Sequence, residues 1–355
     1  MDNKKYLLIY EQLREKIINK TYKYGEKLPS KRVTANDYNV SLVTVEHAYE
    51  LLLEEDYIRA KERSGYYISY KETNYYANPS GLISEKIPEI ASPLDTASLK
   101  KSFSFDIYAK TVRKVLSDYS DEIMQKSPFG GVRLLREGIC NYLKRSRDIN
   151  VDYSQIFIGS GAEYLYGLIC QFLDKDIPYA IESPSYQQIQ KIYESNGINP
   201  QLLPLGKDGI TSEALWNCEA KLIHITPYRS YPTGVSASAS KKREYLRWAK
   251  EKNALILEDD FESEFTPSRK SAETLYSLDT NESVIYVNTF SKTFSSSIRI
   301  AYMVIPHRLL NDFNNKLGFY ACTVPTLEQY ALAYIINNGD FERHINRMRR
   351  HLREN

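Results

Sequence analysis

Residues 284–299 read Val-Ile-Tyr-Val-Asn-Thr-Phe-Ser-Lys-Thr-Phe-Ser-Ser-Ser-Ile-Arg and place a lysine and an arginine shortly after an apolar run. The run Val284–Val287 has the length and the β-branched composition of a buried strand. Lys292 lies five residues after the end of this strand, and Arg299 lies seven residues after Lys292. Because α/β sheets bind ligands where their strands end, this stretch predicts a ligand site at a sheet edge.

Similar short strands alternate with amphipathic helices from about residue 100 onward. The predicted strands are Ile156–Ile158, Tyr179–Ile181, Lys221–Ile225, Ala254–Leu257, Val284–Val287 and Ala301–Val304, and the predicted helices include Glu163–Leu173 and Lys241–Lys252. Strands that alternate with helices indicate a largely parallel sheet that is covered on both faces. Residues 100–355 are therefore predicted to form an α/β domain.

Two further motifs at strand ends add to the predicted site. Gly161 and Ala162 come after a strand and open a helix, so their backbone N–H groups can hold a phosphate. A glycine turn of this kind is by itself usually only a turn. Asp259 follows the strand Ala254–Leu257, and a carboxylate at that place can keep a pyridine nitrogen protonated.

Together with residues 284–299, these motifs supply what pyridoxal phosphate needs. Lys292 can form the Schiff base with the cofactor aldehyde, which makes it the candidate catalytic residue. Arg299 can bind the phosphate, and Tyr186 offers an aromatic face for the ring. A lysine alone would be read as an ordinary exposed side chain, but this order of neighbours predicts a cofactor site.

Residues 1–70 have the pattern of a winged helix-turn-helix. Ile9, Leu13 and Ile17 form an apolar helical stripe. Ser30 can cap a short helix, Lys31–Tyr38, whose Val33 is expected to face inward, and Ser41 can cap a second helix. This second helix has an apolar stripe of its own, formed by Val45, Ala48, Tyr49 and Leu52. Two short strands around Lys61–Gly65 would form the wing.

This domain is predicted to bind duplex DNA by its shape and not by its charge, because residues 1–70 carry 12 Lys and Arg against 11 Asp and Glu. Thr44 is expected on the helix face opposite Val45, Ala48 and Leu52, where it could reach DNA. The candidate DNA-binding residues are Arg32, Ser41, Thr44, Arg63 and Gly65.

The N-terminal segment resembles the GntR superfamily of regulators. The motifs that carry this resemblance are Gly25–Arg32, Val40–Val45, Ala48-Tyr49, Tyr57-Ile58 and Ser64–Ile68. One residue departs from the family pattern: Leu42 stands where the family usually has an arginine that contacts DNA. The resemblance therefore implies DNA binding in which the contact usually made by this arginine is absent.

Residues 100–355 resemble the fold-type I aminotransferase domain of the MocR subfamily of GntR regulators. The motifs include Gly131–Arg136, Ile158–Glu163, Glu182–Tyr186, Tyr231–Gly234, Glu258–Phe261, Thr289–Lys292 and Ser297–Arg299. By position, the resemblance implies a Schiff-base lysine at Lys292, a pyridine partner at Asp259, a stacking ring at Tyr186, and phosphate contacts at Arg299, Thr289 and Ala162. Phe261 replaces a common tyrosine, and the C-terminal small subdomain of the family is expected to be missing.

The expected organisation is a winged helix (residues 1–70), a linker (71–99) and a pyridoxal phosphate-binding, aminotransferase-like domain (100–355) that is C-terminally incomplete. The favoured function is a homodimeric, cytoplasmic transcription regulator that senses pyridoxal phosphate or an amino compound bound to it. The alternatives are an aminotransferase enzyme with an appended DNA-binding domain and a degenerate interaction module without cofactor. The four scattered cysteines show no metal-ligand spacing, and no run of about 18 apolar residues predicts a membrane span.

Overall fold

The computed structural model describes residues 5–62, 64–70, 103–261, 263–266 and 273–354. Contacts divide the chain into two units, Met1–Ser92 and Pro93–Asn355, and each is described by itself. The predicted linker at 71–99 and the candidate DNA contact Arg63 lie outside the described residues.

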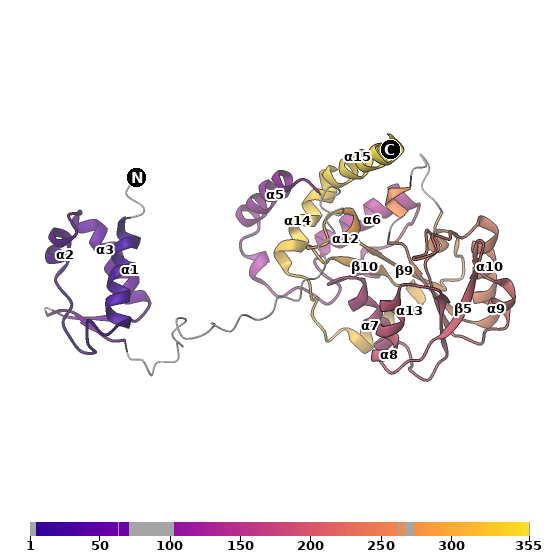
Figure 1. Ribbon diagram of the computed structural model, residues 1–355, viewed down its shortest axis with the longest axis horizontal. Coiled ribbons are helices and arrows are strands. Elements are labelled where there is room, and N and C mark those ends of the chain that lie inside the picture. The colour runs from indigo at the N-terminus through magenta and orange to yellow at the C-terminus, as the bar shows by residue number, and fades with distance from the viewer. Residues whose placement is uncertain (1–4, 63, 71–102, 262, 267–272, 355) are drawn as a thin grey trace. The chain divides into compact units, whose positions relative to one another are not determined.

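The described residues of the N-terminal unit form three helices and a two-stranded hairpin (Figure 1). Its elements are α1 (Lys5–Ile18), α2 (Lys31–Asp37), α3 (Leu42–Glu54), β1 (Ile58–Lys61) and β2 (Gly65–Ile68). Ser30 and Ser41 cap α2 and α3, because each side-chain oxygen accepts a hydrogen bond from a backbone N–H in the first turn. The strands pair antiparallel, with Lys61 opposite Gly65 at the wing turn. The predicted winged helix-turn-helix is therefore confirmed.

The three helices and the hairpin enclose a core of their own. The buried apolar residues are Ile9, Tyr10, Leu13, Ile17, Leu28, Ala35, Val45, Ala48, Tyr49, Leu52, Ile58 and Ile68. The prediction for Val33 was wrong: its side chain is 49% exposed, and α2 buries Thr34 and Ala35 instead. The buried Tyr49 hydroxyl explains why Thr34, and not Val33, faces the core. This hydroxyl lies 2.9 Å from Thr34 Oγ1 and donates a hydrogen bond to Pro29 O at 2.7 Å.

The C-terminal unit is built on a mixed sheet of eight strands in the order β3-β10-β9-β8-β7-β4-β5-β6. The strands are β3 (Ile156–Gly159), β4 (Tyr179–Ser183), β5 (Gln201–Gly206), β6 (Gly209–Ile210), β7 (Leu222–Ile225), β8 (Leu255–Asp259), β9 (Val284–Thr289) and β10 (Ala301–Val304). Strand β10 runs antiparallel to β3 and β9, and β6 runs antiparallel to β5, whereas the other neighbouring pairs are parallel. The α/β fold with a largely parallel sheet agrees with the prediction.

Helices cover both faces of this sheet (Figure 1). Their bounds are α5 (Phe105–Asp118), α6 (Arg133–Arg147), α7 (Ala162–Phe172), α8 (Gln187–Ser195), α9 (Ser212–Trp216), α10 (Ala239–Lys252), α11 (Leu275–Leu278), α12 (Phe290–Thr293), α13 (His307–Leu317), α14 (Thr326–Asn337) and α15 (Asp340–Glu354), with short 3₁₀ turns at Glu122–Met124, Tyr153–Gln155 and Ser263–Phe265. Helices α7, α8 and α13 pack on one face. Helices α6, α14 and α15, and further along α9 and α10, pack on the other.

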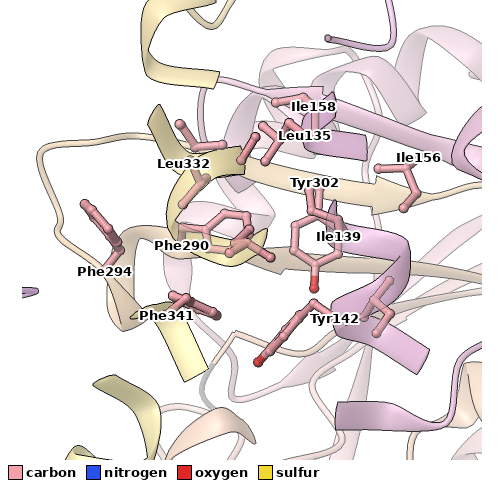
Figure 2. Close-up of a cluster of buried hydrophobic side chains, with 14 of the residues drawn as sticks. Leu135, Ile139, Tyr142, Ile156, Ile158, Phe290, Phe294, Tyr302, Leu332 and Phe341 are labelled. Carbon is pink, nitrogen blue, oxygen red and sulfur yellow. The ribbon is translucent and has the colours of Figure 1, made fainter. Parts of the chain in front are cut away.

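Alternate residues of each strand supply these two cores, as the period of two in a strand requires. In β10, Met303 packs under α7 and α13, whereas Tyr302 and Val304 pack against α6 and α14. Figure 2 shows the second core, where Leu135 and Ile139 of α6 meet Tyr302 and other apolar residues. The side of the sheet that a strand residue faces is therefore fixed by its position in the strand.

Two strands of the sheet were absent from the sequence prediction. Strand β5 contains Pro204 and has several exposed positions, so it has no continuous apolar run. Strand β6 is only two residues long and pairs with the end of β5. Strand β8 is also longer than predicted and ends at Asp259.

Candidate functional site

The predicted cofactor residues meet at one edge of the sheet. Gly159 of β3 is paired with Ala301 of β10, and Ala301 is paired with Thr289 of β9. Because β10 runs opposite to its neighbours, the ends of β3 and β9 and the start of β10 lie at the same edge. Asp259 ends β8 directly beside Val287 of β9. The segments that carry Gly161, Lys292, Arg299 and Asp259 thus converge at this edge, although they are far apart in the sequence.

The start of α7 and the side chain of Arg299 form one end of the site. Gly161 precedes α7 with φ +105°, and a Cβ built at Gly161 would lie 2.6 Å from Nη2 of Arg299. The guanidinium therefore lies directly against the helix start that Ala162 opens. Arg299 Nη2 also donates to Glu163 Oε2 at 2.7 Å. A helix N-terminus beside an arginine is suited to a phosphate, which would compete with Glu163 for the guanidinium.

Thr289 stabilises the junction between β9 and α12 by two hydrogen bonds of its side chain. Its hydroxyl accepts a hydrogen bond from the Ser291 N–H at 3.1 Å and donates to Ile300 O at 3.3 Å. These bonds fix the short helix α12 relative to the start of β10. Lys292 lies on α12 with an exposed side chain, so a small molecule at this edge can reach it.

Asp259 lies in a buried polar cluster under α7 and α8. The Tyr166 hydroxyl donates to Asp259 Oδ2 at 2.6 Å, and His224 Nε2 lies 3.9 Å from the same oxygen. His224 Nδ1 lies 3.1 Å from the Tyr193 hydroxyl. Among the described residues, neither Asp259 Oδ1 nor His224 Nε2 has a hydrogen-bond partner. A buried carboxylate oxygen without a donor is costly, so Asp259 is suited to receive an N–H from a bound ring.

The neighbouring Asp260 belongs to a different cluster on the other face of the sheet. Its Oδ2 accepts from the Tyr286 hydroxyl at 2.7 Å and lies 3.3 Å from Arg147 Nε. Arg147 also pairs with Glu264, whose pKa is raised by burial. Successive strand residues point to opposite faces, so Asp259 and Asp260 cannot exchange roles.

Glu182 and Ser230 are buried near Asp259, and the sequence analysis gave neither of them a role. The Ser230 hydroxyl donates to Glu182 Oε2 at 2.7 Å. Burial raises the pKa of Glu182 to about 7, against the opposing effect of the Ser230 hydrogen bond, and the negative charge of Asp259 raises it further. The motif Glu182–Tyr186 was the only signal in the sequence, and it does not show which side chain turns inward.

Tyr186 lies just beyond the end of β4 and immediately precedes α8, without a side-chain hydrogen bond to that helix start. Its side chain is 43% exposed, and its ring meets the ring of Tyr231 edge-on at 6.0 Å between centroids. Both rings are therefore accessible from solvent in the single chain.

In the winged helix, the candidate residues lie around the start of α3 and the wing. Arg32 is exposed at the start of α2, and Ser41 is exposed at the cap of α3. Gly65 has φ +111° at the wing turn, and a Cβ there would lie 3.1 Å from Lys27 Cε. This glycine therefore permits both the turn and the close approach of Lys27.

Thr44 differs from the expectation. It is half-buried, and its Oγ1 lies 2.7 Å from Ser41 Oγ, so the side chain lies on the flank of α3. Val43, about 200° around the helix from Val45, is the residue that points away from the core and is exposed. Sequence reasoning had assigned the outward face to Thr44, and helical phase counted from Val45 would have found Val43.

Comparison with known proteins matches both units. The family described as "Bacterial regulatory proteins, gntR family" matches residues 5–68, and the family "Aminotransferase class I and II" matches residues 107–355. The HTH-type transcriptional regulator YdeL of Bacillus subtilis is 33% identical over 97% of this chain and 76% of its own length. The "Probable rhizopine catabolism regulatory protein MocR" of Rhizobium meliloti is 27% identical over 96% of this chain and 73% of its own length.

The chain belongs to the MocR subfamily of GntR-type transcription regulators.

A solved aminotransferase has the fold that this MocR-type chain shows in its C-terminal unit. Kynurenine aminotransferase of Pyrococcus horikoshii, solved in complex with PMP, is 25% identical and superimposes with a TM-score of 0.63. The match covers 70% of this chain and 64% of the aminotransferase, so the chain spans less than two thirds of that enzyme. The predicted fold-type I aminotransferase architecture is confirmed.

The described part of the chain contains neither a membrane-spanning helix nor a metal-binding cluster. No helix there is long and apolar enough to cross a membrane. No group of three or more His, Cys, Asp or Glu side chains there is arranged to hold a metal ion.

Proposed function

We propose that this chain is a transcription regulator that binds duplex DNA through the winged helix and pyridoxal phosphate through the aminotransferase-like unit. The observation that carries the proposal is the convergence of Lys292, Asp259 and Arg299 at one sheet edge, in a chain whose other unit is a winged helix. The named relatives are transcription regulators, which favours this function over an aminotransferase enzyme with an appended DNA-binding domain. A DNA-binding regulator of this type would act in the cytoplasm.

The residues at the sheet edge fit pyridoxal phosphate. The start of α7, with Gly161 and Ala162, and the Arg299 guanidinium would hold the phosphate. Asp259 Oδ1, which lacks a donor among the described residues, would accept the pyridine N–H. When bound, the cofactor supplies an aldehyde that captures a primary amine and a ring that withdraws electrons.

Each remaining residue of the site has a separate role in this proposal. The Lys292 amine would bind the aldehyde, and its exposure leaves room for a small amino compound to replace it as effector. Tyr186 would cover one face of the ring. The Tyr166 hydroxyl donates to Oδ2 of Asp259, which leaves Oδ1 as the oxygen that would accept from the ring.

The proposal includes a homodimer. Tyr186 and Tyr231 are exposed beside the site, and Lys292 is exposed as well, so in one chain the site is open to solvent. A cofactor ring is better shielded from water when a second copy covers this edge. Two winged helices would then read two half-sites on the DNA.

The cofactor proposal is tested by adding pyridoxal phosphate to the purified full chain and recording its absorbance. The wild type should develop a visible band that Lys292→Ala abolishes and that the control Lys144→Ala, on an exposed position of α6, retains. Asp259→Asn should weaken cofactor binding about tenfold or more, because it removes a charge-assisted hydrogen bond. Asp260→Asn should lower the melting temperature, since Asp260 balances buried Arg147, but should keep the band. A wild type without a band in excess cofactor would refute the proposal.

A further inference from the structure

Two large apolar side chains are exposed at the very start of helix α3. Leu42 is 43% exposed and Val43 is 59% exposed. They immediately follow the cap residue Ser41, whose Oγ accepts the Thr44 N–H at 3.2 Å. The cap fixes the first turn of α3, so these side chains are held in place on the surface. Neither side chain belongs to the apolar core of the unit, so both are available for contact with a partner.

Helix α3 has no lysine or arginine with which to read DNA bases, and its exposed His47 lies one turn further along the helix than Val43. Its sequence, LVTVEHAYELLLE, contains no lysine or arginine. The two-point hydrogen bonds by which arginine or lysine recognises guanine are therefore absent from this helix. Glu46 could accept from cytosine, but its carboxylate is bound to Lys31 Nζ at 2.6 Å. At the start of α3, the Ser41 and Thr44 hydroxyls bond to each other at 2.7 Å, and Leu42 and Val43 offer apolar contact only.

Basic side chains are present around α3 and can bind phosphates. Arg32 is exposed at the start of α2, and Lys61 is exposed at the end of β1 in the wing. Lys27 packs beside the wing glycine, Gly65. Phosphate contacts position a protein on the duplex without reading its sequence. These basic side chains are therefore suited to positioning the unit on a duplex.

We propose that Leu42 and Val43 read the C5 methyl groups of thymines in the major groove of the operator. The inference rests on the proposed DNA-binding function and names the base that its recognition helix selects. The first residues of a recognition helix contact base edges in the major groove, and the thymine methyl is the apolar group exposed there. Leu42 and Val43 therefore make the operator rich in thymine at the positions that the start of α3 faces.

The experiment uses the full-length chain and duplexes enriched by it from a randomised library. Thymines of an enriched duplex are replaced one at a time by deoxyuridine, which lacks only the C5 methyl group. Binding of the wild type should fall about fourfold for each contacted methyl, the factor expected for one buried methyl-sized group. Leu42→Ala and Val43→Ala should each bind less tightly and lose sensitivity to one or more of these replacements.

Control variants separate reading of the methyl groups from loss of structure. Leu8→Ala removes an equally large apolar side chain, 55% exposed on α1, and should keep the full sensitivity to deoxyuridine. Val43→Thr retains one of the two methyl groups and should give an intermediate loss. Because Leu42 and Val43 are exposed, the melting temperature should hardly change in these variants.

The outcomes distinguish the inference from the function on which it rests. Enrichment of no duplex at all would overturn the DNA-binding function and the inference with it. Enrichment of duplexes that are bound equally well with thymine or deoxyuridine would overturn the inference alone. Equal sensitivity to deoxyuridine in the wild type and in the Leu42→Ala and Val43→Ala variants would place methyl recognition elsewhere in the protein and would also overturn it.

Discussion

At the scale of single residues, the last two residues of β8, Glu258 and Asp259, and the following Asp260 are acidic and have three different environments. Asp259 faces α7 and accepts from Tyr166, whereas Asp260 faces α6 and pairs with Arg147. Glu258 faces the side of Asp260 and accepts the backbone N–H groups of Leu275 at 2.7 Å and of Tyr276 at 2.9 Å. Alternation along the chain thus turns one carboxylate toward the proposed cofactor site and the other two toward the opposite face of the sheet.

Glu258 leads to a prediction about the pH dependence of stability. Burial raises the pKa of Glu258 from its ordinary value of 4.5 to about 8, with the charge of Asp260 as a further cause. The folded protein therefore binds more protons at this site than the unfolded chain between about pH 4.5 and 8. This contribution to stability is complete below pH 4.5 and is lost as the pH rises to 8, at a slope of up to about 1.4 kcal/mol per pH unit.

Glu258→Gln should remove this part of the pH dependence. The measurement is the urea midpoint of the wild type and of the variant at pH 5, 6, 7 and 8. The control Glu219→Gln changes an exposed glutamate that pairs with Lys252 and should leave the slope over this range as in the wild type. Parallel pH profiles for the wild type and Glu258→Gln would contradict the prediction.

At the scale of elements, helix α7 begins at a position that requires glycine. Gly161 has φ +105°, and any Cβ would press on the Arg299 guanidinium. Within the same helix, Gly167 has no heavy atom within 4 Å of a Cβ position. Gly161 is therefore needed for the backbone conformation at the sheet edge, whereas Gly167 only lowers the stability of the helix and can serve as a control.

Alanine at these two positions should have opposite effects. Gly161→Ala should destabilise the unit by about 1–2 kcal/mol and weaken binding of pyridoxal phosphate about tenfold or more, since it displaces Arg299. Gly167→Ala should stabilise by about 0.5–1 kcal/mol and leave cofactor binding unchanged. Thermal melting and absorbance titration measure both effects. A Gly161→Ala variant that binds the cofactor as well as the wild type would remove the start of α7 from the proposed phosphate site.

At the scale of the whole molecule, the chain consists of two units that have separate cores. The winged helix buries Leu13, Val45 and Leu52 among its own elements, whereas the aminotransferase-like unit buries its sheet between two layers of helices. Each unit therefore has a buried apolar core of its own among the residues that the structure describes.

Assembly is predicted to be a homodimer formed through the aminotransferase-like unit. The exposed Tyr186, Tyr231 and Lys292 at the proposed site give the physical reason, because a second copy would exclude water from them. Light scattering of the full chain at micromolar concentration, with pyridoxal phosphate present, should give twice the mass of one chain. A monomeric mass under these conditions would contradict the prediction.

The sequence by itself determined the features that depend on local pattern. Short apolar runs predicted six of the eight strands of the large sheet, and helical periodicity predicted the three helices of the winged helix together with α7 and α10. The serines at positions 30 and 41 predicted the two caps of the helix-turn-helix. The motif at 284–299 predicted a lysine and an arginine at a strand end, because their spacing along the chain is short.

Only the tertiary structure decided the features that depend on packing between distant segments. Tyr166 reaches Asp259 across 93 residues, and no local period encodes such a contact. The Tyr49 hydroxyl fixes α2 so that Val33 is exposed, and the core around Val45 turns Val43 outward and Thr44 to the flank. Strand β5 forms without an apolar run because β4 and β6 supply its hydrogen-bond partners. In each case a side chain or strand takes its orientation from neighbours brought close by folding, which its own stretch of sequence does not specify.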